Sequence, residues 1–336
     1  MRAPEFWHEP PGLLSGLLAP AGLVWQAAGR LRRTVAHPYR APVPVICVGN
    51  LVAGGAGKTP VTMSLARLLA ERGGRPHVIA HGYGARAESP MCVDPGRHEA
   101  ALVGDEALLI AARAPCWVGR DRVAAARSAA MAGAGVLLLD DGFQNPRIAK
   151  DLSLLVVDAD YGFGNGRVIP AGPLRERVGA GLARADAVVL LAAGSHSALA
   201  LDFAGVPVLC ASLDPVAAER FADMPVFAFA GIGRPEKFFA TLRAIGAQLA
   251  GTQPFPDHHP YRVDEIAKLR QAACRRGARL VTTAKDAMRL SAELRAGIEV
   301  LEVEIRWRAP AMLARLLTPF LQPAGGDGHA EARTPP

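Results

Sequence analysis

The chain has 336 residues, of which half are hydrophobic and 6% aromatic, and its formal net charge is +7. This length allows two ordinary domains, and the composition excludes a disordered or fibrous protein. Its five cysteines are scattered without a CxxC pair, which excludes a zinc ribbon and a disulfide framework and suits a reducing cytosol. The positive charge fits an anionic partner such as a nucleotide, an acidic lipid or a nucleic acid, and equally an arginine-rich composition bias.

The first predicted element lies in an uncharged stretch, residues 10–29, that precedes a basic cluster. Glu5 and Glu9 stand where a signal peptide would be positive, and the stretch is marginal in length for a membrane span. Its apolar helical face comprises Leu13, Leu14, Leu17, Leu18, Val24, Trp25, Ala28 and Leu31. The basic cluster comprises Arg30, Arg32, Arg33, His37 and Arg40. We expect either a helix in an anionic membrane surface or a helix packed on the protein's own core.

The next predicted elements are a buried strand at 43–50, a glycine-rich turn and a helix at 62–74. The turn, within "VGNLVAGGAGKTP", ends in Gly-Lys-Thr, but Val52 stands where a phosphate-binding loop usually has its first glycine. The strand before it and the helix after it favour a phosphate loop over a structural turn. In such a loop, backbone N–H groups and the helix N-terminus bind phosphate oxygens.

The predicted nucleotide-binding residues are those of the turn itself: Gly54, Gly55, Ala56, Gly57, Lys58 and Thr59. Lys58 is expected to reach the terminal phosphates, and the Thr59 hydroxyl is expected to bind Mg²⁺. An acidic pair, Asp140 and Asp141, follows the apolar run of a later strand and is the expected metal-side partner, unless it caps a helix. No Asn-Lys-x-Asp guanine-binding motif is present, since Lys285 and Asp286 are adjacent, which favours ATP.

Further strands are predicted within 76–84, 135–144, 152–160 and 185–193, with helices at 105–113 and 121–133. Short apolar strands that alternate with helices indicate a parallel sheet covered on both faces. A second α/β unit starts near Met224 and ends in the strand 298–307 and a final helix.

The predicted fold class is α/β. It consists of a P-loop NTPase-like α/β/α sandwich with a second, smaller α/β domain and an N-terminal membrane-surface helix. The expected parts are the membrane-associating segment 1–40, the nucleotide-binding core 41–222, the smaller domain 223–322 with the final helix, and a disordered tail 323–336.

Three polar clusters remain open to more than one interpretation. Asp105, at a loop-to-helix junction, is either a helix cap or a base for an attacking hydroxyl. The "DHH" at 257–259 is a metal cluster, a histidine that tunes a base, or a solvated turn, and the alternating directions of consecutive side chains disfavour a two-histidine metal site. Arg175, in the long loop 164–177, is either a phosphate ligand or solvated.

Taken together, these motifs resemble the tetraacyldisaccharide 4'-kinase family, the lipid A 4'-kinases. The matching stretches follow one another over residues 6–290: "FW" (6–7), 41–61, "GYG" (82–84), "GDE" (104–106), "DDGFQ" (140–144), "GNGRVIPAGPLRE" (164–176), "AGIGRPEKFF" (230–239), "DHH" (257–259) and "TAKDA" (283–287). The glycine loop together with "GNGRVIPAGPLRE" is specific to this family. The family's loop also lacks a glycine at the position of Val52.

The resemblance implies a membrane-associated kinase that uses Mg²⁺ to transfer the γ-phosphate of ATP to the 4'-hydroxyl of an acylated disaccharide 1-phosphate. It places the protein peripherally on the cytoplasmic face of the bacterial inner membrane. It implies that Asp105 is the general base and His258 its partner. Arg175, with Asn165 and Gln144 from the matched stretches, is assigned to substrate or phosphate binding. We expect no nucleic-acid partner and see no sign of an obligate protein partner.

The chain departs from the family pattern at three positions. His81 replaces the arginine of "SRGYG", Asn145 replaces the histidine of "DDGxQH", and Ala284 replaces the glutamate of "TEKDA". We predict an active kinase with altered substrate contacts. The main alternative is a soluble P-loop NTPase that acts as a metallochaperone-type or partitioning switch, and another is a membrane-bound nucleotide sensor that needs no base.

Overall fold

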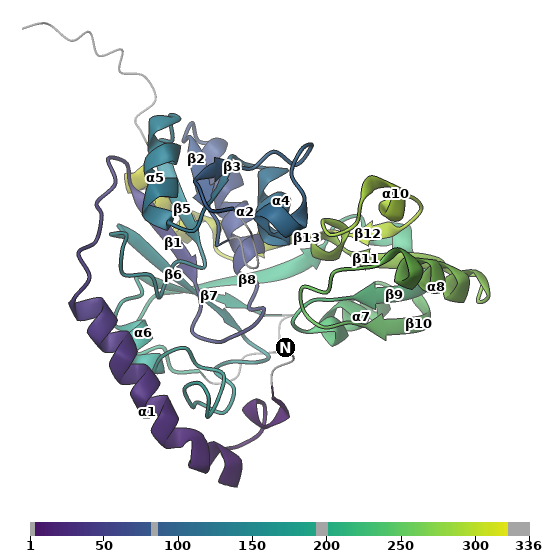
Figure 1. Ribbon diagram of the computed structural model, residues 1–336, viewed down its shortest axis with the longest axis horizontal. Helices are drawn as coiled ribbons and strands as arrows, with labels where there is room; N and C mark the ends of the chain where they lie inside the picture. The colour runs from purple at the N-terminus through teal and green to yellow at the C-terminus, as the bar shows by residue number, and fades with distance from the viewer. Residues whose placement is uncertain (1–3, 82–86, 193–200, 322–336) are drawn as a thin grey trace, which may run out of the picture.

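The computed structural model describes residues 4–81, 87–192 and 201–321 and contains two β-sheets (Figure 1). The "GYG" stretch and the tail 323–336 lie outside the described residues. Within them, one sheet has nine strands in the order β13-β8-β7-β6-β1-β5-β2-β4-β3, and the other has four in the order β10-β9-β11-β12. We call the two sheets with their covering helices the larger and the smaller unit.

The larger sheet is parallel except for its two edge strands, β3 and β13. Its strands are β1 (Val45–Gly49), β2 (Pro76–Ile79), β3 (Met91–Cys92), β4 (Cys116–Val118), β5 (Val136–Asp140), β6 (Leu152–Asp158), β7 (Ala187–Leu191), β8 (Val208–Pro215) and β13 (Val303–Trp307). Its helices are α2 (Lys58–Ala70), α3 (Ala100–Val103), α4 (Asp105–Ala111), α5 (Arg122–Met131), α6 (Val178–Leu182) and α11 (Pro310–Leu317). The strands β3, β4 and β8 of this sheet are additions to the predicted set.

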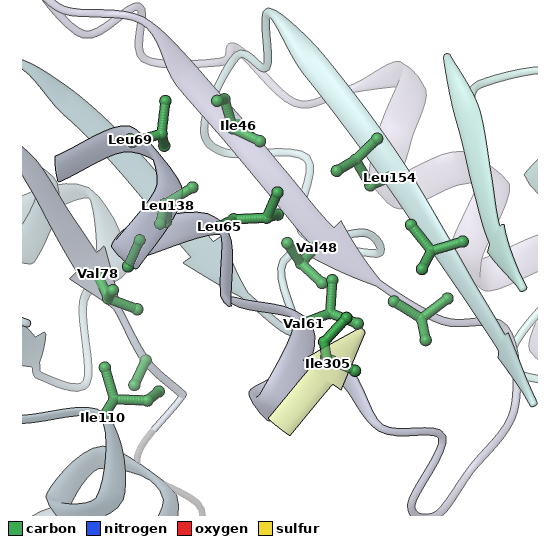
Figure 2. Close-up of a cluster of buried hydrophobic side chains, with 14 of the residues drawn as sticks. Ile46, Val48, Val61, Leu65, Leu69, Val78, Ile110, Leu138, Leu154 and Ile305 are labelled. Atoms are coloured by element: carbon green, nitrogen blue, oxygen red, sulfur yellow. The ribbon is translucent and has the colours of Figure 1, made fainter. Parts of the chain in front are cut away.

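Alternate residues of the central strand β1 enter two separate hydrophobic cores. Ile46 and Val48 pack with Val61 and Leu65 of α2, as Figure 2 shows. Val45 and Cys47 face the opposite side, where the small residues of α5 pack. Burial of both faces is typical of a parallel sheet between helical layers. The predicted α/β/α sandwich is therefore confirmed.

The smaller unit repeats this architecture on a four-stranded parallel sheet (Figure 1). Its strands are β9 (Pro225–Ala230), β10 (Gln248–Pro254), β11 (Arg279–Thr283) and β12 (Glu299–Leu301). Its helices are α7 (Pro235–Ala244), α8 (Val263–Cys274), α9 (Ala284–Ala287) and α10 (Ala292–Arg295). Phe238 and Phe239 of α7 pack on one face of β9, and Ile266 and Leu269 of α8 pack on the other.

The expected extent of the smaller domain, 223–322, is wrong at its C-terminal end. β13 pairs antiparallel with β8 in the larger sheet, from Val303 opposite Pro215 to Trp307 opposite Ala211. Leu313 and Leu317 of α11 are buried in the larger unit's core. The run predicted as one strand at 298–307 is thus divided between the two sheets, and the chain crosses between the units twice, at β8 and at β13.

The helix α1 (Leu13–Thr34) continues past Pro20 and lies along the outside of the larger unit (Figure 1). Small residues make its contact: Ser15 donates a hydrogen bond to the Ala171 carbonyl, and Gly22 packs on the Val168 carbonyl. Its apolar side chains face outward, with Leu13 91% and Leu17 78% exposed. The alternative of an apolar face packed on the core is therefore wrong. None of the described helices is both long and apolar enough to cross a membrane.

Candidate active site

The candidate site lies where the carboxyl ends of β1, β5 and β6 meet, next to the smaller unit. In an open parallel sheet, ligands bind beyond the carboxyl ends of the strands at such a point. β1 leads into the loop Gly54–Thr59, which we call the phosphate loop, and α2 begins at Lys58. β5 ends at Asp140, and β6 ends at Asp158. Three adjacent central strands thus bring polar residues to one edge.

The phosphate loop has the backbone of an anion site. Gly54 and Gly57 have left-handed φ angles of 111° and 83°, which only glycine adopts without strain. Among the described residues, the N–H groups of Gly54, Gly55, Ala56 and Gly57 donate no hydrogen bond within the protein. Because α2 starts directly after them, these N–H groups and the helix N-terminus face the same space.

Val52 occupies the position of the missing glycine and has a packing role. Its side chain is buried in the same core as Leu51 and Leu174, and its backbone forms an isolated antiparallel bridge with Leu174. The neighbouring Ala53 donates its N–H to the carbonyl of Pro173 at 2.8 Å. A side chain at position 52 therefore anchors the phosphate loop to the loop 164–177.

Lys58, Thr59 and the acidic pair lie together as predicted. Lys58 Nζ is 3.2 Å from Asn50 Oδ1 and 3.7 Å from Asp141 Oδ2. The Thr59 hydroxyl donates to Asp140 Oδ2 at 3.1 Å, and the Thr62 hydroxyl donates to Asp140 Oδ1 at 2.9 Å. The two aspartates do not cap a helix. Asp140 is instead tied to α2, and Asp141 faces the lysine.

The two carboxylates differ in their electrostatic environment. Burial raises the pKa of Asp140 to about 6, and the nearby charge of Glu106 adds to the rise. Burial also acts to raise the pKa of Asp141, but the charges of Lys58 and Arg175 hold it well below its usual range. A cation bound near Asp140 would offset the cost of its buried charge. Both groups offer the oxygen ligands that Mg²⁺ prefers.

Arg175 contacts the acidic pair rather than solvent. Its guanidinium donates twice to Asp141, at 2.7 and 3.0 Å, and once to Gln144 Oε1 at 3.2 Å. Gln144 in turn donates to the carbonyl of Asn50 at 2.9 Å. The buried Arg122 donates to the backbone carbonyls of Asp140 and Asp141. Asp141 itself has a left-handed φ of 51°, a strained conformation of the kind that clusters at functional sites.

Asp105 lies against the smaller unit, whose side chains surround it. It is the first residue of α4, and Gly104 is the N-cap, so Asp105 is not a helix cap. His258 Nδ1 is 3.0 Å from Asp105 Oδ2, and Arg289 Nε donates to the same oxygen at 2.5 Å. Burial acts to raise the pKa of Asp105, but the hydrogen bond from His258 and the charges of Lys285 and Arg289 hold it well below its usual range.

The three members of the "DHH" motif have different partners. His258 contacts Asp105, His259 Nε2 is 2.9 Å from Glu265 Oε2, and Asp257 Oδ1 forms an ion pair with Lys285 Nζ at 3.4 Å. The two histidines therefore diverge, as expected for consecutive residues. His258 also has a left-handed φ of 58°. Among the described residues, no three His, Cys, Asp or Glu side chains are arranged to hold a metal ion by themselves.

A second contact between the units lies directly at the phosphate loop. Arg234 of the smaller unit donates to the Gly55 carbonyl at 3.2 Å and forms an ion pair with Asp158. Lys237 joins the same carboxylate at 2.6 Å. A Cβ atom added to Gly233 would lie 3.2 Å from the Gly55 nitrogen. The turn before α7 thus covers part of the phosphate loop.

Asn165 is the predicted site residue that lies away from this cluster. Its amide donates to the carbonyls of Phe6 and Ala171, and its Oδ1 accepts the N–H of Arg167. These contacts fix the loop 164–177 and tie it to the N-terminal residues. The helix α1 uses the same loop, because Trp25 Nε1 donates to the Arg175 carbonyl at 3.0 Å. The helix and the arginine of the site are therefore in direct contact.

The three departures from the family pattern have different surroundings. His81 follows β2 and its side chain is exposed, and partial desolvation together with the charge of Arg122 lowers its pKa. Asn145 accepts the N–H of Arg147 through its side chain. Ala284 is the first residue of α9, and its methyl group adds no charge beside Lys285.

Sequence reasoning did not assign roles to Asn50, Arg122, Lys285 or Arg289. Each is charged or polar and largely buried at the site, and each contacts a predicted residue. Lys285 stands in the matched "TAKDA" stretch, which is a usable signal. Arg289 lies beyond that stretch, and nothing in the local sequence separates it from the other arginines.

Comparison with known proteins shows the family of the chain. The family model described as Tetraacyldisaccharide-1-P 4'-kinase matches residues 14–322. A tetraacyldisaccharide 4'-kinase from Rhodospirillum centenum is 56% identical over 99% of this chain and 100% of its own length. One from Parvibaculum lavamentivorans is 53% identical over 87% of both chains.

A solved structure is also similar over nearly the whole chain. It is the "apo" form of LpxK from Aquifex aeolicus in complex with ATP, with a TM-score of 0.75 and 26% identity. The match covers 92% of this chain and 100% of the Aquifex aeolicus chain. On the family match and the two relatives, the chain belongs to the tetraacyldisaccharide-1-P 4'-kinase family.

Proposed function

We propose that this protein is an ATP-dependent kinase that transfers the γ-phosphate to the 4'-hydroxyl of a tetraacyldisaccharide 1-phosphate, a step of lipid A biosynthesis. The observation that carries the proposal is the pairing of two sites at one sheet edge. One is a phosphate loop with Lys58, and the other is the carboxylate of Asp105 held by His258. A protein that only hydrolyses or senses nucleotide has no need for a second site that accepts a hydroxyl proton.

The phosphate loop would bind the nucleotide through its free N–H groups. Lys58 is 11% exposed, and its Nζ lies 3.7 Å from Asp141, so the ammonium group is not tightly paired. It would contact the terminal phosphates. Arg175, bound to the same aspartate, is the second cation that could stabilise charge on the transferred group. In phosphoryl transfer such positioning and charge stabilisation supply most of the rate.

The residues that fit Mg²⁺ are Thr59, Asp140 and Asp141. All three offer oxygen ligands, and Mg²⁺ is commonly held by one or two carboxylates together with substrate phosphates. Thr59 and Asp140 are already in contact at 3.1 Å, and burial disfavours the charged form of Asp140. When bound, the ion would neutralise charge on the phosphate oxygens.

Asp105 is the proposed base for the 4'-hydroxyl. It would accept the hydroxyl proton as the oxygen attacks phosphorus, a contribution of about 10²–10⁴-fold. His258 lies 3.0 Å from its Oδ2 and would hold the carboxylate in place. Because this histidine comes from the smaller unit, the base is complete only when the two units are together.

The acylated substrate explains the exposed face of α1. Its outward leucines, valine and tryptophan would enter the apolar boundary of a bilayer, and Arg30 and Arg32 would meet anionic lipid headgroups on the cytoplasmic face of the inner membrane. Since Trp25 and Ser15 contact the loop 164–177, this helix would bring the site to the headgroup level, where the sugar of the lipid lies.

The test is a transfer assay with radiolabelled ATP and the tetraacyldisaccharide 1-phosphate in mixed micelles. We expect labelled lipid from the wild-type protein, and its loss in Lys58→Ala and Asp105→Ala. If the wild-type protein hydrolyses ATP vigorously but does not label the lipid, the kinase proposal fails. If Asp105→Ala labels the lipid as well as the wild-type protein does, Asp105 is not the base.

A further inference from the structure

We propose that Arg289, in the smaller unit, is a positioning residue that holds the Asp105 carboxylate ionised and leaves one defined oxygen atom to accept the proton. The inference rests on the proposed function, because it takes Asp105 as the base. Arg289 lies outside the sequence motifs. Three observations support the inference: the contacts of Arg289, the buried hydrogen bonds of Asp286 that hold it, and the unequal number of partners on the two carboxylate oxygens of Asp105.

Arg289 and Asp105 form a buried ion pair across the two units. Their side chains are 5% and 4% exposed, and Arg289 Nε donates to Asp105 Oδ2 at 2.5 Å. The same guanidinium donates through Nη1 to the Gly231 carbonyl at 2.8 Å and to Asp286 Oδ1 at 2.9 Å. Its Nη2 is buried and has no hydrogen-bond partner among the described residues. An arginine placed for the fold alone would normally have all its buried donors paired.

A rigid set of hydrogen bonds fixes Arg289 from behind. Asp286, which is fully buried, accepts the N–H of Gly231 at 2.9 Å and the hydroxyl of Tyr261 at 2.8 Å on the oxygen that Arg289 contacts. Its other oxygen is 2.6 Å from the Thr283 hydroxyl. Gly231 directly follows β9, Thr283 ends β11, and Tyr261 lies in the segment before α8. The position of the guanidinium is thus set by the sheet of the smaller unit.

The partners of Asp105 are divided unequally between its two oxygens. Oδ2 accepts a hydrogen bond from Arg289 Nε and lies 3.0 Å from His258 Nδ1. These two contacts use both lone pairs of Oδ2. Oδ1 accepts only the N–H of Glu106, at 2.8 Å, among the described residues. One lone pair therefore remains, and it belongs to Oδ1.

The chemical step follows from this division. The substrate's hydroxyl proton moves to Asp105 Oδ1, and the freed electron pair on the sugar oxygen forms the new bond to the γ-phosphorus. The bond from that phosphorus to the oxygen bridging to the β-phosphate breaks, and its electron pair leaves with ADP. Oδ2 stays bound to Arg289 and His258 throughout, so the carboxylate does not rotate when it accepts the proton.

Three cationic or titratable groups of the smaller unit face Asp105: His258 from the loop before α8, Lys285 from α9, and Arg289. Its own helix contributes Glu106, which pairs with Lys285 at 3.1 Å. Of these partners, Arg289 makes the shortest contact and the only one through a permanently charged group. Removal of its charge leaves a buried carboxylate with weaker compensation, so the carboxylate binds a proton more readily.

The experiment compares full-length wild type, Arg289→Met, Arg289→Lys and Tyr261→Phe in the lipid phosphorylation assay from about pH 3 to 8, a range that extends below the ordinary aspartate pKa of about 3.9. Asp105 works only when deprotonated, so activity falls as pH drops through its pKa. For Arg289→Met we expect kcat to fall about 10–100-fold at pH 7, with KM for ATP unchanged within about twofold. We also expect its acid limb to move about one pH unit or more towards neutrality.

The two other variants separate positioning from folding. Arg289→Lys keeps the charge and is expected to keep the acid limb of the wild type while losing part of kcat. Tyr261→Phe removes a buried hydrogen bond of the same network without touching Asp105, and its acid limb is expected to stay in place. Thermal melting of each variant reports folding. If Arg289→Met does not fold, Arg289→Lys and Asp286→Asn decide the question. Asp286→Asn loosens Arg289 and is expected to lower kcat without lowering affinity for ATP.

Arg289→Met with the kcat and pH profile of the wild type would overturn the inference. So would a uniform loss at every pH that Tyr261→Phe reproduces, because that result indicates a purely structural role. A shift of the acid limb in Arg289→Lys as large as in Arg289→Met would exclude the role of the charge. A wild type that does not phosphorylate the lipid at any pH would instead overturn the proposed function, and this inference with it.

Discussion

Lys58 is held in the candidate site by two side chains. Its Nζ lies between Asn50 Oδ1 and Asp141 Oδ2, so the charge is compensated without being fully paired at short range. The motif predicted the lysine and its role, but not Asn50, because an asparagine after a strand has no distinctive pattern. Contacts made by residues far apart in sequence, such as Arg289 with Asp105, are likewise not encoded in any local spacing.

At the residue scale, we predict that Lys58→Met lowers kcat/KM for lipid phosphorylation by about 10²–10³-fold, because it removes a cation aimed at the transferred phosphate. Lys268→Met is the matched control. Lys268 is 77% exposed, and its charge partner within the described part of the chain is Asp264, so this variant is expected to have wild-type activity. Equal losses in both variants would show that the effect comes from total charge rather than from the site.

Asp105 also gives a prediction about stability. Its pKa in the folded protein is held well below its usual range by His258, Lys285 and Arg289 against the effect of burial. A carboxylate with a depressed pKa stabilises the fold above its unfolded pKa of about 3.9 and loses that contribution as pH falls towards the folded value. We therefore expect Asp105→Asn to unfold at lower urea than the wild type at pH 7. The difference should shrink below about pH 4, and a constant difference down to acid pH would contradict this.

At the scale of elements, the strand, loop and helix around the phosphate loop were predictable from sequence. The apolar pattern, the glycines and Gly-Lys-Thr all indicate the same strand-loop-helix unit. The division of residues 298–307 was not. β12 ends at Leu301 and β13 starts at Val303, and the two belong to different sheets. Glu302 between them pairs with Arg113 of the larger unit at 2.5 Å. The local sequence of an apolar run does not indicate whether its residues join one sheet or two. Only tertiary contacts show that residues 298–307 form two strands in different sheets.

The helix α1 gives a second prediction at this scale. Leu17→Glu places a charge on its exposed apolar face and is expected to reduce binding to anionic vesicles and to raise KM for the lipid, because the face can no longer enter the interface. Met131→Glu is the matched control, since Met131 is 88% exposed on α5, which lies apart from α1 (Figure 1). Unchanged vesicle sedimentation of Leu17→Glu would contradict the membrane role of α1.

At the scale of the whole molecule, charged side chains of the described residues join the two units at two clusters. One is Asp105 with His258 and Arg289, and the other is Asp158 with Arg234 and Lys237. The resemblance predicted two domains and the Asp105–His258 contact. The Asp158 cluster was not predicted, because its partners are separated by more than 70 residues.

We predict that Asp158→Asn lowers the free energy of unfolding by about 1–3 kcal/mol, because it leaves two cations without their buried partner. Asp214→Asn, which breaks the exposed pair with Arg306, is expected to cost about 1 kcal/mol or less. Urea denaturation of both variants measures the difference. Equal costs would show that the Asp158 cluster does not join the units more strongly than a surface ion pair.

The central claim is that the nucleotide and base sites act on one lipid. Its most direct test is the stoichiometry of the purified wild-type protein with ATP, Mg²⁺ and tetraacyldisaccharide 1-phosphate, measured as ADP released and phosphate gained by the lipid. The structure predicts one lipid phosphate, on the 4'-oxygen, for each ADP, and little ADP release without the lipid. ADP release that is independent of the lipid, with no phosphate on the lipid, would contradict the claim and favour an NTPase switch.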